Sequence, residues 1–121
     1  MTIVPTEAEE QKMLFEWASY MQQRFRELEL MYHVPNGGKR DAIEAAHMKQ
    51  QGVKAGVPDI CLPVARHGYH ALYIELKRRD GGKLSVFQKT FLVKLEQQGN
   101  LCIVAKGAEA AANAIKEYLS E

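Results

Sequence analysis

Two short segments are the most informative about the fold: Gly56–Ile60, with the sequence GVPDI, and Ile74–Lys77, with the sequence IELK. They lie in two runs rich in Val, Ile, Leu and Tyr, Val57–Leu62 and Ala71–Leu76, and a polar segment that contains glycine separates the runs. Runs of this length and composition are typical of β-strands, and the short connection favours a hairpin. The sequence therefore predicts two neighbouring strands that carry charged residues.

Three charged side chains on these strands form a candidate site. Side chains alternate between the faces of a strand, so Glu75 and Lys77 share one face while Leu76 points into the opposite layer. If Asp59 lies on the same face of the neighbouring strand, its carboxylate comes close to that of Glu75. Two close carboxylates repel each other unless a cation lies between them, and hard oxygen ligands suit Mg²⁺ or Mn²⁺. With Lys77 beside them to orient or deprotonate a water, the set is typical of phosphodiester hydrolysis.

These motifs resemble those of the PD-(D/E)xK nuclease superfamily and, more narrowly, of the VRR-NUC (virus-type replication-repair nuclease) family. A Glu-x-Lys triplet alone is common and usually marks a solvated strand edge, but a Pro-Asp on a second strand makes the pattern far more specific. The resemblance runs from about residue 7 to residue 119. It rests on Glu10-Gln11, Pro35–Gly38, Gly56–Asp59, Ile74–Lys77 and Ser85–Gln88. It implies a restriction-endonuclease-like core and a divalent-metal-dependent deoxyribonuclease.

Length and composition predict one soluble domain. A chain of 121 residues can bury one core, so we expect residues 1–121 to form a single nuclease domain. The apolar and charged contents are ordinary, no apolar run approaches membrane-spanning length, and the N-terminus lacks a signal-peptide pattern. We therefore expect a cytoplasmic protein of a bacterial or phage-infected cell, with no membrane or organic cofactor as partner. Cys61 and Cys102 are interpreted as small buried hydrophobic residues.

Charge is unevenly distributed along the chain, although the net charge is only +1. Residues 1–30 carry 3 basic and 6 acidic side chains, residues 31–94 carry 11 and 5, and residues 95–121 carry 2 and 4. Positive charge is thus concentrated around the candidate site, as a phosphate-binding face requires, although a charged run is also what any solvated surface carries. The candidate DNA-binding residues are Asn36, Lys39, Arg40, Lys54, Arg78, Arg79 and Lys83.

The N-terminal segment predicts one long amphipathic helix from about Glu7 to Leu30. Thr6–Glu9 has the form of a capping box, and apolar residues follow at helical spacing. Extending the apolar stripe backward reaches Glu10, so its carboxylate faces inward, where a charge is costly unless it is paired. A first-turn acid that favours the helix dipole is the alternative. The resemblance points to Glu10 as a third acidic group near the metal, bound directly or through a water.

The remaining segments complete an α/β order. We expect a strand at Leu30–Val34, a helix from Arg40 or Asp41 to about Gln51, a helix from Ser85 to near Gly99, a strand at Leu101–Ala105 buried on both faces, and a helix at Gly107–Leu119. The full order is helix, strand, helix, strand, strand, helix, strand, helix. It predicts a central mixed β-sheet flanked by helices.

Gln88 has two interpretations. Ser85–Gln88 is itself a capping box, in which the glutamine side chain bonds back to the Ser85 backbone. The resemblance instead places Gln88 beside the attacking water or the scissile phosphate. We expect one short side chain to fill only one of these roles, and we favour the site.

The resemblance also implies the roles of the other residues and the substrate. Asp59, Glu75 and the Leu76 carbonyl bind the metal, and Lys77 positions the water. Stand-alone members, often phage-encoded, resemble structure-selective enzymes of DNA repair and recombination. We therefore expect a homodimer that resolves four-way (Holliday) junctions, each two-fold related site cutting one strand. The sequence has no major-groove helix rich in Arg, Asn and Gln, which favours reading of backbone shape. The alternatives are a sequence-specific restriction or homing-type endonuclease and a non-catalytic DNA-binding module.

Overall fold

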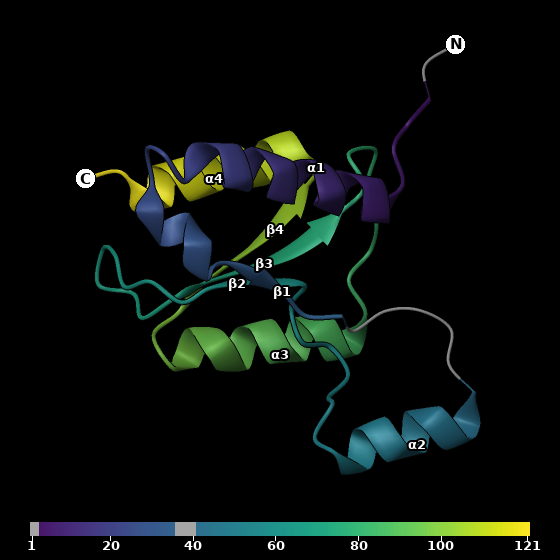
Figure 1. Cartoon of the computed structure of the whole chain (residues 1–121). Helices are drawn as coiled ribbons and strands as arrows, with labels where there is room; N and C mark the ends of the chain where they lie inside the picture. The colour runs from purple at the N-terminus through teal and green to yellow at the C-terminus, as the bar shows by residue number, and fades with distance from the viewer. Residues whose placement is uncertain (1–2, 36–40) are drawn as a thin grey trace.

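A four-stranded mixed sheet forms the centre of the molecule (Figure 1). The structure is a computed structural model, and it describes residues 3–35 and 41–121. The elements are α1 (Glu7–Met21), the 3₁₀ helix η1 (Arg26–Leu30), β1 (Tyr32–His33), α2 (Ala42–Gln50), β2 (Ile60–Leu62), β3 (Leu72–Lys77), α3 (Val86–Gln97), β4 (Leu101–Lys106) and α4 (Ala108–Leu119). The predicted α/β class and order of elements are confirmed, with η1 added between α1 and β1.

The strands lie in the order β1-β2-β3-β4. β2 and β3 are antiparallel, with Ile60 opposite Ile74, so the predicted hairpin is confirmed. β4 joins β3 in parallel after the crossover through α3. β2 begins at Ile60, so Val57–Asp59 forms the segment that leads into the strand.

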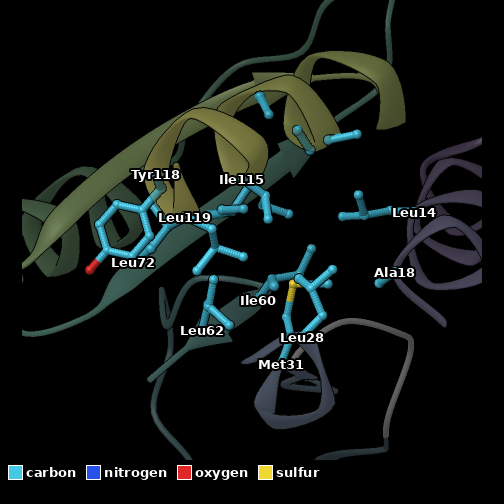
Figure 2. Packing of buried hydrophobic residues seen from close by; sticks show 14 of the residues in the cluster. Leu14, Ala18, Leu28, Met31, Ile60, Leu62, Leu72, Ile115, Tyr118 and Leu119 are labelled. Atoms are coloured by element: carbon cyan, nitrogen blue, oxygen red, sulfur yellow. The ribbon is translucent and has the colours of Figure 1, made fainter. Parts of the chain in front are cut away.

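Helices cover both faces of the sheet (Figure 1). α1 and α4 pack against each other on one face, and α3 lies on the other. The main core lies between the sheet and the α1–α4 layer, where Leu14, Ile60 and Ile115 are fully buried (Figure 2). α2 stands apart from this body and has no buried residue (Figure 1). Within the described ranges, no helix combines the length and the apolar character needed to cross a membrane.

The predicted single helix from Glu7 to Leu30 is wrong. α1 ends at Met21, where the Phe25 N–H donates to the Met21 carbonyl, and the chain turns into η1. The turn returns Leu28 and Met31 to the sheet, where both are buried. A continuous helix would have carried Leu28 about 20 Å beyond Leu14 at 1.5 Å per residue, far from the core that it completes.

The prediction that the last strand is buried on both faces is also wrong. Of β4, only Ala105 is buried, and the Val104 side chain is 42% exposed. β4 is the last strand of the sheet, so it has a neighbour on one side only. An uninterrupted apolar run predicts burial, but the sequence does not say which strand lies at the edge.

Candidate active site

Asp59 and Glu75 lie side by side where β2 and β3 begin to pair. Ile60 is opposite Ile74, so the same antiparallel register places Asp59 opposite Glu75, and opposed side chains share one face. The two carboxyl groups interact, and the charge of Asp59 contributes to the raised pKa of Glu75. Asp59 Oδ2 also accepts from the Leu76 N–H at 2.8 Å. The predicted convergence of the two acids is therefore present, and their catalytic role stays a prediction.

Glu75 is buried without full compensation. Its side chain is 1% exposed, and Oε2 is a buried oxygen with no hydrogen-bond partner within the described part of the chain. The pKa of Glu75 is raised to about 8; burial is the largest cause, the interaction with Asp59 adds to it, and Lys77 opposes the shift. Such a group accepts a cation readily, because a cation would relieve both the burial and the repulsion.

Lys77 and Gln88 complete the partly buried cluster. Lys77 Nζ lies 3.8 Å from Glu75 Oε1 and donates to Gln88 Oε1 at 3.3 Å, while Gln88 Nε2 donates to Glu75 Oε1 at 3.0 Å. Lys77 is 9% exposed, since Gly82 packs against its aliphatic stem. Gln88 therefore fixes the position of both charged groups.

Gln88 caps α3 and also contacts the charged groups of the site, while its role beside the water or the phosphate stays a prediction. Its Oε1 accepts from the Ser85 N–H at 2.8 Å while the Ser85 hydroxyl accepts from the Gln88 N–H, so the capping box of α3 is formed. The same oxygen also accepts from Lys77, and the amide nitrogen reaches Glu75. A carbonyl oxygen has two acceptor sites and an amide nitrogen has two donors, so one side chain can cap the helix and hold the site.

The loop that carries Asp59 is held against the start of α3. Gly56 has a φ of +86°, and a Cβ there would lie 2.4 Å from the Phe87 carbonyl oxygen. Only glycine allows this approach, which joins the GVPD segment to the helix that carries Gln88. On the other side, the Asp59 carbonyl accepts from the Val34 N–H at 2.7 Å, and His33 Nδ1 lies 2.9 Å from it. Asp59 is thus fixed by β1 as well as by β3, which the sequence did not predict.

Glu10 is hydrogen-bonded to groups outside this cluster, and its predicted place near the metal stays a prediction. The carboxylate is fully buried and accepts four hydrogen bonds, three from the backbone and guanidinium of Arg79 and one from the Ala108 N–H. These donors lower the pKa of Glu10 to about 2, and the Arg79 side chain is the largest cause. The inward direction of Glu10 was predicted correctly, but its partners are a cation and the N-terminus of α4, whose N-cap Gly107 has no side chain to cap it.

Glu7, at the start of α1, interacts electrostatically with the site. Partial burial raises the pKa of Glu7, the charge of Asp59 raises it further, and Lys77 lowers it. Glu7 also contributes to the raised pKa of Glu75. The sequence pattern singled out Glu10 on this helix and missed Glu7. The available signal was its position three residues before Glu10, on a neighbouring part of the same helix face.

The candidate DNA-binding residues divide into two groups. Asn36, Lys39 and Arg40 lie outside the described residues. Of the others, Lys54 and Lys83 are exposed on loops. Arg78 Nε lies 3.3 Å from Asp80 Oδ1, and Arg79 is paired with Glu10, so both arginines have protein partners.

The donor set fits a hard divalent cation. The described residues contain no group of three or more His, Cys, Asp or Glu side chains able to hold a metal. Asp59 and Glu75 supply two carboxylates. The Leu76 N–H donates to Asp59 Oδ2, and the Lys77 carbonyl accepts from the Gly107 N–H after β4, so the Leu76 backbone faces β2 and the Lys77 backbone faces β4. Mg²⁺ typically takes one or two carboxylates and keeps several waters, so two acids and one carbonyl are sufficient.

Comparison with known proteins identifies the family of the chain. The VRR-NUC domain matches residues 3–109, which include every residue of the cluster. A solved structure described as a VRR_NUC domain protein is similar to this chain with a TM-score of 0.83 and 31% sequence identity, over 98% of this chain and 91% of that chain. Among curated proteins, none matches.

Proposed function

Because the chain belongs to the VRR-NUC family of nuclease domains, we propose that it is a metal-dependent endonuclease that hydrolyses phosphodiesters in branched DNA. The family implies a nuclease with DNA as its substrate. The observation that supports the finer proposal is the pair formed by half-buried Asp59 and buried Glu75, with an unpaired Glu75 carboxylate oxygen and a lysine beside it. A like-charge pair in a buried site is costly, and a bound cation removes that cost.

In this proposal Asp59, Glu75 and the Leu76 carbonyl hold Mg²⁺ or Mn²⁺. When bound, the ion supplies positive charge that offsets the negative charge developing on the phosphate. Glu75 and Asp59 stay ionised as its ligands, and the Leu76 N–H fixes the Asp59 carboxylate.

Lys77 and Gln88 act on the attacking water. The lysine ammonium has three donors, and one goes to Gln88 Oε1, so the others can hold a water or a phosphate oxygen. Gln88 keeps the ammonium beside Glu75 and therefore sets the direction of those donors. Glu7, in place of Glu10, adds negative charge from α1 and favours the bound cation electrostatically.

The proposed substrate is a four-way junction cut by a homodimer. Support comes from the excess of basic residues between positions 31 and 94 and from the lack of a helix suited to reading bases. One site cuts one strand, so paired cuts need two copies, and a two-fold dimer matches the pseudo-two-fold symmetry of the junction.

The experiment is a gel assay on labelled linear duplex, flap, splayed arm and four-way junction, each with and without Mg²⁺ or Mn²⁺. We expect metal-dependent cutting, with the junction preferred. Asp59→Ala should abolish cutting and retain junction binding, while Asp80→Ala, which changes an exposed acid near the site, should keep both. Metal-dependent cutting by folded Asp59→Ala protein would overturn the assigned site.

The same assay separates the alternatives. Cuts at one fixed sequence in linear duplex would indicate a restriction or homing-type enzyme. Binding without cutting at any metal concentration would indicate a non-catalytic module.

A further inference from the structure

The first turn of α3 exposes two apolar side chains beside the candidate active site. Val86 and Phe87 are 75% and 66% exposed, and they immediately precede Gln88, whose amide nitrogen donates to Glu75. The other three phenylalanines of the chain are all partly buried. A single exposed apolar residue is ordinary, but two adjacent ones at the rim of a site are candidates for contact with a partner.

The capping box of α3 determines which way Phe87 points. It holds Gln88 against Ser85, and Gln88 faces the sheet together with buried Leu92, which follows it by four residues. Successive residues of a helix are about 100° apart, because 3.6 residues make one turn. The Phe87 side chain therefore leaves the helix on the side next to this inward stripe, where it is exposed.

The segment that carries Asp59 lies directly against Phe87. The Gly56 backbone packs against the Phe87 carbonyl so closely that no side chain fits between them. Gly56 precedes Asp59 by three residues, a span of at most about 10 Å. A stacked DNA strand rises about 3.4 Å per nucleotide, so this span equals about three nucleotides. A DNA strand bound at the carboxylate pair therefore passes within reach of Phe87.

The two segments around Phe87 carry positive charge only. Neither residues 81–95 nor residues 51–58 contain an acidic residue, and their charged side chains are four exposed lysines: Lys54, Lys83, Lys89 and Lys94. An exposed aromatic ring among positive charges is the combination that binds single-stranded nucleic acid, because lysines attract the phosphates and the ring stacks on a base. A protein interface buries about 800 Å² on each partner, far more than two side chains offer, whereas one base matches their size.

We propose that Phe87 stacks on an unpaired base of the DNA substrate, close to the phosphodiester that is cut, and that Val86 packs beside it. This inference rests on the proposed function and deepens it. A base within a duplex is stacked between its neighbours, so it can meet the ring only where pairing ends. Phe87 therefore favours DNA with unpaired nucleotides at a branch point over linear duplex. Every base has a π face, so the preference is for structure and not for sequence.

The test is a binding assay in which single bases are removed from the DNA. Labelled splayed-arm DNA is titrated with Asp59→Ala protein without divalent cation, and each nucleotide near the branch is replaced in turn by an abasic one. We expect one position at which the loss of the base raises the Kd by about tenfold, as for one base stacked on an aromatic ring. Adding Phe87→Ala should raise the Kd of the intact DNA by the same factor, and the abasic position should then cost nothing more. Affinity for fully paired duplex should not change.

Two further variants control for changes in the fold. Tyr20→Ala removes an aromatic side chain of similar exposure, 72%, from α1 on the other face of the sheet (Figure 1), and it should leave every affinity unchanged. Phe87→Trp keeps an aromatic face and should keep the wild-type dependence on the abasic position. Circular dichroism verifies that each variant is folded.

The outcomes distinguish this inference from the proposed function. A Phe87→Ala protein that keeps the dependence on the abasic position, an equal loss of affinity in Tyr20→Ala, or no preference for splayed-arm DNA over duplex would overturn the role of Phe87. A protein that cuts branched DNA but shows any of these results would refute the stacking role alone. A protein that binds through Phe87 as described but never cuts DNA would refute the proposed nuclease activity alone.

Discussion

Glu10 and Glu75 are both buried carboxylates, 0% and 1% exposed, and their surroundings shift their pKa values in opposite directions. Glu10 accepts four N–H donors, and its pKa falls to about 2. Glu75 has Asp59 beside it and one oxygen without a partner, and its pKa rises to about 8. Burial alone therefore does not identify a functional acid.

The two carboxylates differ in how completely the protein compensates their charge. The charge of Glu10 is satisfied by Arg79 and by the start of α4, so this acid joins three elements of the fold. The charge of Glu75 is satisfied only in part by Lys77 and Gln88. An ionisable group that the protein leaves under-compensated in a fixed place is a candidate for chemistry, whereas a fully paired group is a candidate for stability.

The largest expected effect is on catalysis by Glu75→Gln. The substitution keeps the size of the side chain and removes a metal ligand, so cutting of a four-way junction should fall by at least about 1000-fold, the equivalent of several kcal/mol of transition-state stabilisation. Single-turnover cleavage rates measure the effect. Glu10→Gln, assayed at a temperature where it is folded, should cut at a rate within about tenfold of wild type, which corresponds to about 1.4 kcal/mol of activation free energy. Equal losses of cleavage rate in the two variants would contradict the distinction between a catalytic Glu75 and a structural Glu10.

The second effect is on stability, and it falls on Glu10. Glu10→Gln leaves the Arg79 guanidinium without its carboxylate and should lower the free energy of unfolding by about 3 kcal/mol, the low end for a broken buried ion pair because Arg79 is half exposed. Urea denaturation measures it. Glu75→Gln relieves the repulsion with Asp59 and should leave the metal-free protein as stable as wild type or more stable. A Glu10→Gln protein as stable as wild type would contradict the structural role.

The two acids should give opposite pH dependences of stability in the absence of metal. The raised pKa of Glu75 means that its contribution is complete below the unfolded value of 4.5 and is lost as the pH rises through about 8. The lowered pKa of Glu10 means that its contribution is complete above 4.5 and is lost as the pH falls through about 2. Melting temperatures in EDTA should thus decline toward pH 8 in wild type and less in Glu75→Gln. Identical slopes would refute the assignment for Glu75.

The smallest effects separate the two roles of Gln88. Gln88→Ala removes both the cap and the contact with Glu75, so stability should fall by about 1 kcal/mol and cutting should slow by about tenfold. Gln88→Glu can still cap the helix but adds a third carboxylate at the site. It should slow cutting at least as much while keeping near wild-type stability in the metal-bound protein. Full activity of Gln88→Glu would limit this residue to capping.

The sequence predicted what depends on local pattern. Strand alternation and turn spacing were enough to place Asp59 near Glu75 and Lys77, because an antiparallel hairpin leaves few registers that bury Ile60 and Ile74. The capping boxes at Thr6 and Ser85 were likewise visible, since each depends on residues three apart.

Features that depend on contacts between distant parts of the chain were not predictable from the same patterns. The backward extension of an apolar stripe showed that Glu10 points inward, but Arg79 and Ala108, its partners, are 69 and 98 residues away. α1 ends at Met21 because the chain must turn there to bury Leu28 against the sheet. The exposure of β4 depends on its place at the edge, which the apolar run Leu101–Ala105 does not encode.

Titration of Mn²⁺ into wild type, Glu75→Gln and Glu10→Gln by isothermal calorimetry measures which of the two buried acids is a metal ligand. We expect a binding event in wild type, its loss in Glu75→Gln and its retention in folded Glu10→Gln. Unchanged binding in Glu75→Gln, or loss of binding in Glu10→Gln alone, would contradict this assignment.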